Sequence, residues 1–335
     1  MEKDFLSTAN DIMVAAQLAA ALEVSGTPKP GNVHRDADFI DTRFEHYLAG
    51  SVAIGPSIME VALRGINTGL DRIDIKDIGI GNYIKEAVHK VRSWHKGGNT
   101  HLGIVMLFVP LAASAGLAFT RFGRIEPNGW RSMLLKIMKA TTYQDAIHVC
   151  DAIIESGTAA LGRLKARTVP DLLSHDLKDR MMEHGLNLYQ LMKVSSKWDN
   201  VAKELTNGMK ISFDLGYRTL MNVYEKMGDI NIATVHTFLT ILTKHPDTFI
   251  ARKVGLKQTE GIVRAVKIGL IEAKKVSRRA ERVLKLGGMT SEAGRRALNR
   301  FDRDLRDSGS RLNPGTTADI TASSLMIAIL CGMRP

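Results

Sequence analysis

The chain has 335 residues, of which 44% are hydrophobic and 24% are charged. This composition excludes a disordered or fibrous protein, since disorder requires few core-forming residues. Cys150 and Cys331 lie far apart, each in an apolar stretch, which predicts reduced core thiols and a cytoplasmic protein. The acidic start of the chain lacks the basic region of a signal peptide, so no export is expected.

The net charge of +11 is concentrated in one segment. Residues 252–311 contain 17 Lys/Arg and 7 Asp/Glu, a balance that attracts phosphorylated small molecules, coenzymes or nucleic acid. A solvated helix face is the more common meaning of such a run. Only 6% of the residues are aromatic and no nucleic-acid recognition motif is present. A non-enzymatic nucleic-acid-binding or scaffold protein is therefore kept as an alternative that we disfavour.

Apolar residues recur at three- and four-residue spacing along most of the chain, which predicts helices. Asn10 or Asp11 is expected to cap the first helix. Further helices are expected over 45–69, 82–94, 102–120, 130–139, 143–166, 171–193, 199–226, 231–243, 257–286, 291–306 and 317–332. We interpret the short strand candidate 72–76 as a polar loop. The uncharged segment 103–120 is interpreted as a buried core helix, not as a membrane span.

The fold prediction is therefore all-α, with a single multi-helix bundle-like domain over residues 1–335. The turn from Thr168 to Asp171 is the best candidate for a weak subdivision. Four segments interrupt the helical pattern, and they hold most of the unusual residues. Because loops carry chemistry more often than helix faces do, we expect the active site to be built from these interhelical loops.

The first loop runs from Ser25 to Asp38. Two prolines bracket Lys29 and stiffen its backbone, so this lysine would lose little freedom on binding phosphate. Asp36 and Asp38 could hold Mg²⁺ through their oxygens. The alternative is a connector between helices with surface charges.

The second loop runs from His95 to Gly103. Gly97, Gly98, Asn99 and Thr100 precede the apolar helix, so backbone N–H groups and a helix dipole could bind an anion there. His101 could act as a general base or donate to phosphate. The alternative is an ordinary glycine turn in which Asn99 or Thr100 caps the helix.

The third loop runs from Lys244 to Lys253. Asp247 or Thr248 would cap a helix that carries Arg252 and Lys253 about one turn later. An Asp followed by a Thr could also coordinate a metal or position a sugar hydroxyl. A plain capped helix is the alternative.

The fourth loop, from Leu312 to Thr321, places small hydroxylated residues after a Pro-Gly pair at the start of the last helix. Asp319 could be a metal ligand, a catalytic carboxylate or a residue that complements the helix dipole.

The order of these loops and the residues in them resemble those of the triphosphoribosyl-dephospho-coenzyme A synthase family. The resemblance spans roughly residues 10–330. The family's Pro-Lys-Pro-Gly-x-Val is matched by Pro28 to Val33, and its Asp-Thr motif before basic residues corresponds to Asp247, Thr248, Arg252 and Lys253. Its Gly-Gly-x-Asn-Thr-His-Lys-Gly is matched less fully, by Gly97, Gly98, Asn99, Thr100, His101 and Gly103. Its Ser-Pro-Gly-Gly-Ser-Ala-Asp resembles Asn313 to Asp319, with Pro314, Gly315, Ala318 and Asp319 kept. The resemblance implies an all-helical enzyme in which a ribose hydroxyl of dephospho-coenzyme A attacks the ribose C1 of ATP. Adenine then leaves and the triphosphate stays.

Such a reaction would use Mg²⁺ and a phosphorylated small-molecule donor, either ATP or phosphoribosyl diphosphate. The expected catalytic residues are His101 as general base, His34 as the second choice for that base, and the carboxylates Asp247 and Asp319. Asp36 and Asp38 are the expected metal ligands. The expected substrate-binding and phosphate-binding residues are Lys29, Gly31, Asn32, Gly97, Gly98, Asn99, Thr100, Thr248, Arg252, Lys253, Gly315, Thr316 and Thr317.

The main departure from the family pattern is Leu102, where the motif has lysine. Loss of that charge favours an alternative within the same class, in which phosphoribosyl diphosphate donates a phosphoribosyl group during biosynthesis of a tetrahydromethanopterin-type cofactor. In both versions the partners are small molecules and no membrane is involved. The sequence leaves the oligomeric state open, with a homodimer as one option.

Overall fold

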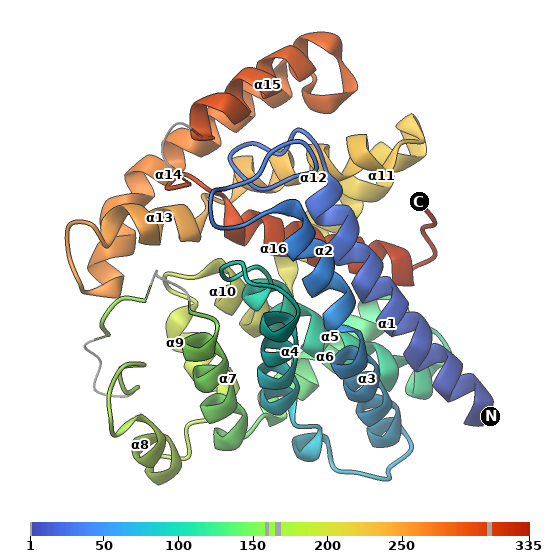
Figure 1. Ribbon diagram of the computed structural model, residues 1–335. Helices are drawn as coiled ribbons and strands as arrows, with labels where there is room; N and C mark the ends of the chain where they lie inside the picture. Colours follow the sequence, from blue (N-terminus) through green and yellow to red (C-terminus); the bar gives the residue numbers. More distant parts are fainter. Residues whose placement is uncertain (1, 158–160, 165–168, 307–309) are drawn as a thin grey trace.

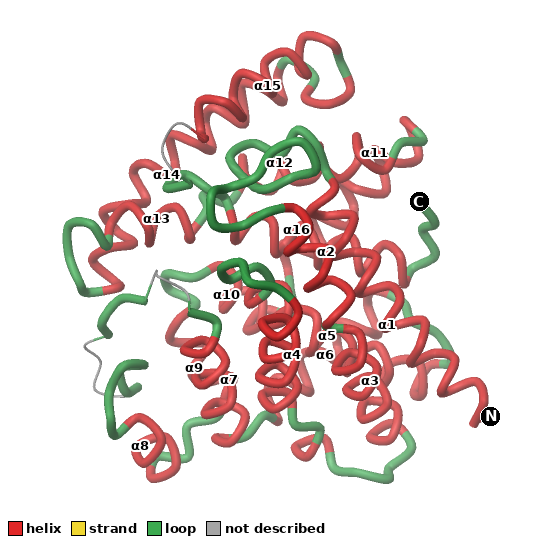
Figure 2. Tube along the Cα trace, viewed as in Figure 1, coloured by secondary structure: helices red, strands yellow, loops and turns green. Residues whose placement is uncertain are grey.

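The computed structural model describes residues 2–157, 161–164, 169–306 and 310–335. Within this part of the chain there are helices and loops but no β-strand, as Figure 2 shows. Two isolated bridges, His34 with Ala37 and Arg163 with Gly261, are the only β-type pairings among the described residues. The all-α prediction is confirmed.

The helices follow one another along the chain as drawn in Figure 1. Their bounds are α1 Glu2–Ser25, α2 Phe44–Ala53, α3 Gly55–Gly69, η1 Ile75–Asp77, α4 Ile80–Trp94, α5 Leu102–Phe122, α6 Pro127–Ala140, α7 Tyr143–Glu155, α8 Leu177–Glu183, α9 Leu188–Ser195, α10 Asn200–Asn207, η2 Ser212–Tyr217, α11 Arg218–Met227, α12 Ile230–Lys244, α13 Thr248–Gly255, α14 Ile262–Lys285, η3 Gly288–Thr290, α15 Glu292–Arg306 and α16 Gly315–Leu330.

Helix α5 is the centre of the main core. Its residues from Ile104 to Ala118 are buried, including Pro110 inside the helix. At Gly65 and Gly116 a Cβ atom would come within 2.3 Å of backbone oxygen on the facing helix, so glycine lets α3 and α5 approach closely. Two helices, α1 and α5, are long and apolar enough to cross a membrane, but 83% of the α5 window is buried inside the protein. A core helix explains that burial, as the sequence predicted.

A second apolar cluster lies among α12, α13, α14 and α15, and Ile232 and Leu164 pack against both clusters. In Figure 1 these four helices occupy the upper part of the molecule, with α15 at its outer edge. The suggested boundary at 168–171 begins at Thr168, which lies outside the described residues, while Val169 and Pro170 are buried. The single-domain organisation stays a prediction.

Several predicted helix limits were wrong. Helix α1 begins at Glu2, so Asn10 and Asp11 lie inside it and cap nothing. The helix expected over 143–166 ends at Glu155. The stretch 171–193 is two short helices, since Gly185 adopts φ +56° and Asn187 caps α9. The apolar spacing continues across these turns, so periodicity alone does not show where the helices end.

The same error occurs in the stretch 199–226, which is divided into α10, a π-helical turn and α11 after Gly208 at φ +73°. The stretch 257–286 begins too early, because α14 starts at Ile262. The strand candidate at 72–76 is a loop that leads into the short η1 helix, as expected.

The two cysteines are unpaired. Cys150 is buried and Cys331 is partly buried at the end of α16. Their interpretation as thiols of the helical core, not a disulfide, agrees with the structure.

Candidate active site

A cavity of about 230 Å³ receives residues from all four loops. Asn32 comes from the first loop, and Asn99 and Thr100 come from the second. Arg252 belongs to the third loop, and Asp319 belongs to the fourth. In Figure 1 the loop between α1 and α2 lies over the N-terminal end of α16. Segments nearly three hundred residues apart in the sequence thus border one space.

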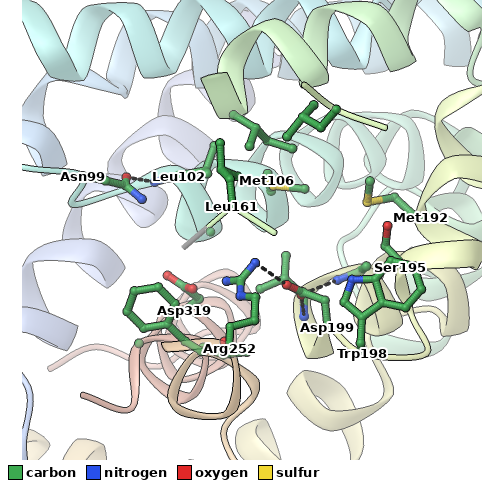
Figure 3. Close-up of a pocket in the computed structure, with 18 of the residues that line it drawn as sticks. Asn99, Leu102, Met106, Leu161, Met192, Ser195, Trp198, Asp199, Arg252 and Asp319 are labelled. Carbon is green, nitrogen blue, oxygen red and sulfur yellow. Dashed lines mark hydrogen bonds and ion pairs between the residues drawn. The ribbon is translucent and has the colours of Figure 1, made fainter. Parts of the chain in front are cut away.

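Asp319 is the carboxylate that points into this cavity (Figure 3). It lies on the second turn of α16, too far along to cap the helix. Among the described residues, neither a hydrogen-bond donor nor an ion-pair partner contacts its oxygens. Burial raises the pKa of Asp319 well above its usual value, and the like charges of Glu23 and Asp247 raise it further. A buried acid without a partner is costly, and such groups are found at functional sites.

Gly103 makes room for this carboxylate. A Cβ atom at position 103 would lie 2.0 Å from Oδ2 of Asp319. The glycine is therefore required by the approach of α5 to α16, although its backbone is an ordinary helix. Neighbouring Leu102, which replaces the lysine of the family motif, also lines the cavity.

Asp247 has the opposite environment. Its Oδ1 accepts hydrogen bonds from the N–H groups of Phe249 and Ile250, at 2.9 and 3.0 Å. Its Oδ2 accepts from both the N–H and the hydroxyl of Thr317, each at 2.8 Å. Burial raises the pKa of Asp247, and these four donors oppose the rise. The side chain caps α13 and ties it to α16, and it is absent from the cavity lining among the described residues.

Lys29 is fully buried and pairs with Glu23 on α1. Its Nζ donates to the carboxylate of Glu23 and, at 2.9 Å, to the backbone carbonyl of the same residue. Burial lowers the pKa of Lys29, while the charge of Glu23 opposes this. Glu23 lines the cavity, whereas Lys29 lies behind it. The geometry therefore favours a lysine that holds Glu23 over one that binds donor phosphates directly.

Positive charge reaches the cavity from Arg252 and from three helix ends. Nη1 of Arg252 lies 3.2 Å from Oδ2 of Asp199, the residue that caps α10. First-turn residues of α5, α10 and α16 line the cavity, among them Gly103, Ala202 and Thr316. Helix N-termini carry partial positive charge, so three of them around one space favour an anionic ligand. The first N–H groups of α10 already donate to Thr248 and Asp199.

His101 is almost fully buried and borders a separate small void. Its Nδ1 lies 2.7 Å from the hydroxyl of Thr100, and its Nε2 lies 3.4 Å from that of Ser51. Burial lowers the pKa of His101 to about 3, so the ring is neutral at physiological pH. A neutral ring with both nitrogens engaged is a poor general base.

The direction of this hydrogen-bond chain follows from its two ends. Nδ1 of His95 accepts the N–H of Gly97, so the neutral ring carries its proton on Nε2 and donates to Thr100. The Thr100 hydroxyl must then donate to Nδ1 of His101. At the far end, Ser51 donates to the carbonyl of Tyr47 and accepts from His101. The two histidines therefore fix the orientation of the Thr100 hydroxyl, and Thr100 lines the cavity.

The rest of the first loop is held by the α15 carboxylate Asp302. Its Oδ1 accepts the N–H of Gly31 at 2.8 Å, and its Oδ2 lies 3.3 Å from Nε2 of His34. Gly31 adopts φ +70° and packs against Leu305, so glycine is needed at this turn. His34 is buried in this contact and is not among the described residues that line the cavity. Its placement favours a positioning role.

Asp36 and Asp38 are exposed and bonded locally. The hydroxyl of Thr27 donates to Asp36 at 2.6 Å, and the N–H of Phe44 donates to Asp38 at 2.8 Å. No group of three or more His, Cys, Asp or Glu side chains suited to a metal occurs in the described part of the chain. The metal-binding role of Asp36 and Asp38 stays a prediction.

The other predicted residues divide between the cavity and its support. Gly315 and Thr316 line the cavity, whereas Gly97, Gly98, Thr248, Lys253 and Thr317 are outside its lining in the described structure. Gly97 packs against His46, and Thr248 accepts the N–H of Asn200 at 3.1 Å. Nζ of Lys253 donates to the carbonyl of Ser310 at 2.8 Å.

Sequence reasoning missed several polar residues of the described cavity lining, among them Glu23, Tyr47, Asp199 and Asn313. Burial and the charge of Glu23 raise the pKa of Tyr47, and Oδ1 of Asn313 is buried without a partner among the described residues. A single acid in the apolar helix around Ala19 to Val24 was the signal that could have revealed Glu23. Tyr47 lies within α2 and Asp199 caps α10, and neither position has a comparable signal in the sequence.

Comparisons with known proteins show the family and support the fold. The model of the CitG family, ATP:dephospho-CoA triphosphoribosyl transferase, matches residues 9–334. The 2-(5''-triphosphoribosyl)-3'-dephosphocoenzyme-A synthase of Klebsiella pneumoniae is 22% identical over 324 residues, covering 94% of this chain and 89% of the relative. A crystal structure from Archaeoglobus fulgidus, provisionally described as a triphosphoribosyl-dephospho-coA synthase, is 23% identical with a TM-score of 0.57. That match covers 86% of this chain and 100% of the other, and supports the fold. The chain is thus a transferase that belongs to the ATP:dephospho-CoA triphosphoribosyl transferase family.

Proposed function

We propose that this chain transfers a triphosphoribosyl group from ATP to a ribose-type or ribitol-type hydroxyl of a coenzyme precursor, within the 230 Å³ cavity. The observation that carries the proposal is Asp319, a partly buried carboxylate without an internal partner among the described residues, facing the space where the four loops meet. Transfer at a ribose C1 develops positive charge on the sugar, and a desolvated carboxylate stabilises such charge effectively.

The donor phosphates would lie at the helix N-termini beside Arg252. Gly315 and Thr316 open α16, and Gly103 lies in the first turn of α5. The N–H groups of Gly103 and Thr316 and the guanidinium are the donors that phosphate oxygens require, whereas the N–H of Gly315 donates to the carbonyl of Asn313. Asn32, Asn99 and Asn313 add amides to the cavity lining, and such groups suit the polar edge of a purine.

Mg²⁺ fits the same end of the cavity. Among the described residues, the cavity lining carries three carboxylates, Glu23, Asp199 and Asp319, and one cationic side chain, Arg252. Mg²⁺ is usually bound by one or two carboxylates together with substrate phosphates, so a complete protein cage is unnecessary. Asp319 and Glu23 would hold it, with Asp36 and Asp38 as the alternative from sequence. When bound, the ion neutralises phosphate charge.

The bonds balance in one substitution. An acceptor oxygen bonds to the ribose C1 as the bond from C1 to the adenine nitrogen breaks. The electron pair of that bond leaves with adenine, and the acceptor hydroxyl gives up its proton. Asp319 is placed to counter the charge at C1 or to take this proton, and its raised pKa makes this carboxylate more basic than an ordinary aspartate. His101 was the earlier candidate for the base, and its buried, engaged ring favours a role in orienting Thr100.

The test is to incubate the purified protein with ATP and Mg²⁺ in the presence of dephospho-coenzyme A, and to measure free adenine by mass spectrometry. We expect adenine release that depends on the acceptor and a product heavier by the triphosphoribosyl group. Diphosphate release from phosphoribosyl diphosphate, without adenine release from ATP, would favour the second candidate, phosphoribosyl transfer in a tetrahydromethanopterin-type pathway. Leu102 in place of the family lysine is the observation behind that candidate. If neither adenine nor diphosphate is released, both candidates are refuted.

The remaining properties belong to the same proposal. Small phosphorylated substrates and unpaired cysteines support a cytoplasmic enzyme. A homodimer stays a prediction from sequence, and sedimentation would decide it.

A further inference from the structure

The cavity has two chemically different sides. Asp319, Arg252 and Asp199 lie along one side in Figure 3, and Leu161, Met106 and Met192 lie across from them. The apolar side is formed by side chains of α5, α7, α8 and α9 and of the segment before α8. Its principal members are Met106, Ile153, Leu172, Met181, Leu191 and Met192.

This apolar side offers few hydrogen-bonding groups. Within the described lining, Ser195 and Trp198 are its polar side chains, and both lie at its edge in Figure 3. Met181 and Met192 are buried, so the wall is part of the main core. A phosphate or a purine edge placed there would lose hydrogen bonds to water without replacing them. An apolar group placed there would gain van der Waals contacts with side chains that otherwise face an empty apolar space.

The donor is assigned to the polar side of the cavity. Its phosphates suit Arg252 and the first turn of α16, next to which Asp319 faces the cavity. Once the donor is placed there, the apolar wall is left for the second substrate. This assignment rests on the proposed function, because only a group transfer requires two substrates in one cavity.

We infer that the acceptor is an alcohol whose hydroxyl-bearing sugar or polyol continues into an apolar aryl or alkyl segment, and that this segment packs against the wall of α7, α8 and α9. Flexible methionines suit such a wall, since their side chains adapt to the shape of a ligand. The wall then selects the acceptor, and the polar side selects the donor.

The inference predicts a binding preference that needs no turnover. Phenyl β-D-ribofuranoside should bind the full chain at least ten times more tightly than methyl β-D-ribofuranoside in calorimetry. Equal affinities would overturn the inference. ATP should leave the affinity for the phenyl compound unchanged or increase it, when measured in Asp319→Asn so that no reaction intervenes. Displacement by ATP would place the aryl group in the donor site and would also overturn it.

A matched pair of variants locates the effect. Leu172 lines the cavity, and its neighbour Leu173 is 41% exposed. Leu172→Asn should remove most of the preference for the phenyl compound, and Leu173→Asn should retain it, with thermal melts showing that both fold. The same result in both variants would contradict a wall at Leu172. If the preference holds but no donor yields product, the proposed function fails while the apolar site stands; if product forms without any preference, this inference alone fails.

Discussion

Two aspartates near the N-terminal ends of neighbouring helices have completely different surroundings: Asp247 is buried, and Asp319 is partly buried. Asp247 accepts four hydrogen bonds and joins α13 to α16. Asp319 has none within the described chain and faces the cavity. Burial raises the pKa of both. The same residue type therefore stabilises the fold in one place, and in the other is kept at a cost to stability for a ligand.

The largest expected effect is on turnover. Asp319→Asn keeps the size of the side chain beside Gly103 but removes its charge. We expect kcat to fall about 10²–10³-fold, the range for a group that stabilises charge in the transition state. Adenine release measured over a range of ATP concentrations will separate kcat from KM. A change in KM alone would assign Asp319 to binding and would blur the contrast with Asp247.

Asp247→Ala should act on stability. It leaves two N–H groups of α13 and both donors of Thr317 without their acceptor, which should cost about 2–4 kcal/mol of unfolding free energy in urea. Asp229→Ala is the control, because Asp229 is an exposed cap that accepts only the N–H of Ile232. Its loss should cost about 1 kcal/mol. Equal costs would show that the α13–α16 connection contributes little.

Acid should destabilise the protein through His101. Its folded pKa is about 3, below its usual 6.5, so the unfolded chain binds the proton first. The stability from this group is complete above pH 6.5 and is lost as pH falls toward 3. At pH 4.5 the loss should reach roughly 2–3 kcal/mol. His101→Gln should flatten the stability profile between these limits, whereas the variant of exposed His89 should not. An unchanged profile in His101→Gln would contradict a neutral, buried ring.

The smallest effect is expected on the basic surface. Arg300 is exposed on α15, far from the cavity lining. Arg300→Gln should change the unfolding free energy by less than about 0.5 kcal/mol and leave turnover nearly unchanged. Duplex DNA binding measured at two salt concentrations checks the alternative use of this surface. Tight binding with a steep salt dependence would support the nucleic-acid role instead.

The sequence predicted helices and the four loops well, because apolar spacing and Gly/Pro turns are local signals. It could not tell which carboxylate has internal partners. Asp247 and Asp319 look alike in sequence, and only the packing of α13 on α16 supplies Thr317 to one of them. From sequence, Lys29 is predicted to bind phosphate. The sequence does not reveal its pairing with Glu23, because that contact depends on how the first loop folds back on α1. Helix limits failed where single residues such as Gly185 break a continuous apolar pattern.

The central claim is that Asp319 is held without a partner for the substrate. The most direct measurement is the thermal melt of Asp319→Asn at pH 7.5, with and without Mg²⁺ and ATP, beside its adenine release. Because the folded pKa of Asp319 is raised, its contribution to stability is lost as pH rises above the unfolded value, so the neutral amide should be tolerated better. We predict a melting temperature at or above that of the wild type, with turnover nearly abolished. A variant that melts several degrees lower and still releases adenine at the wild-type rate would contradict the account.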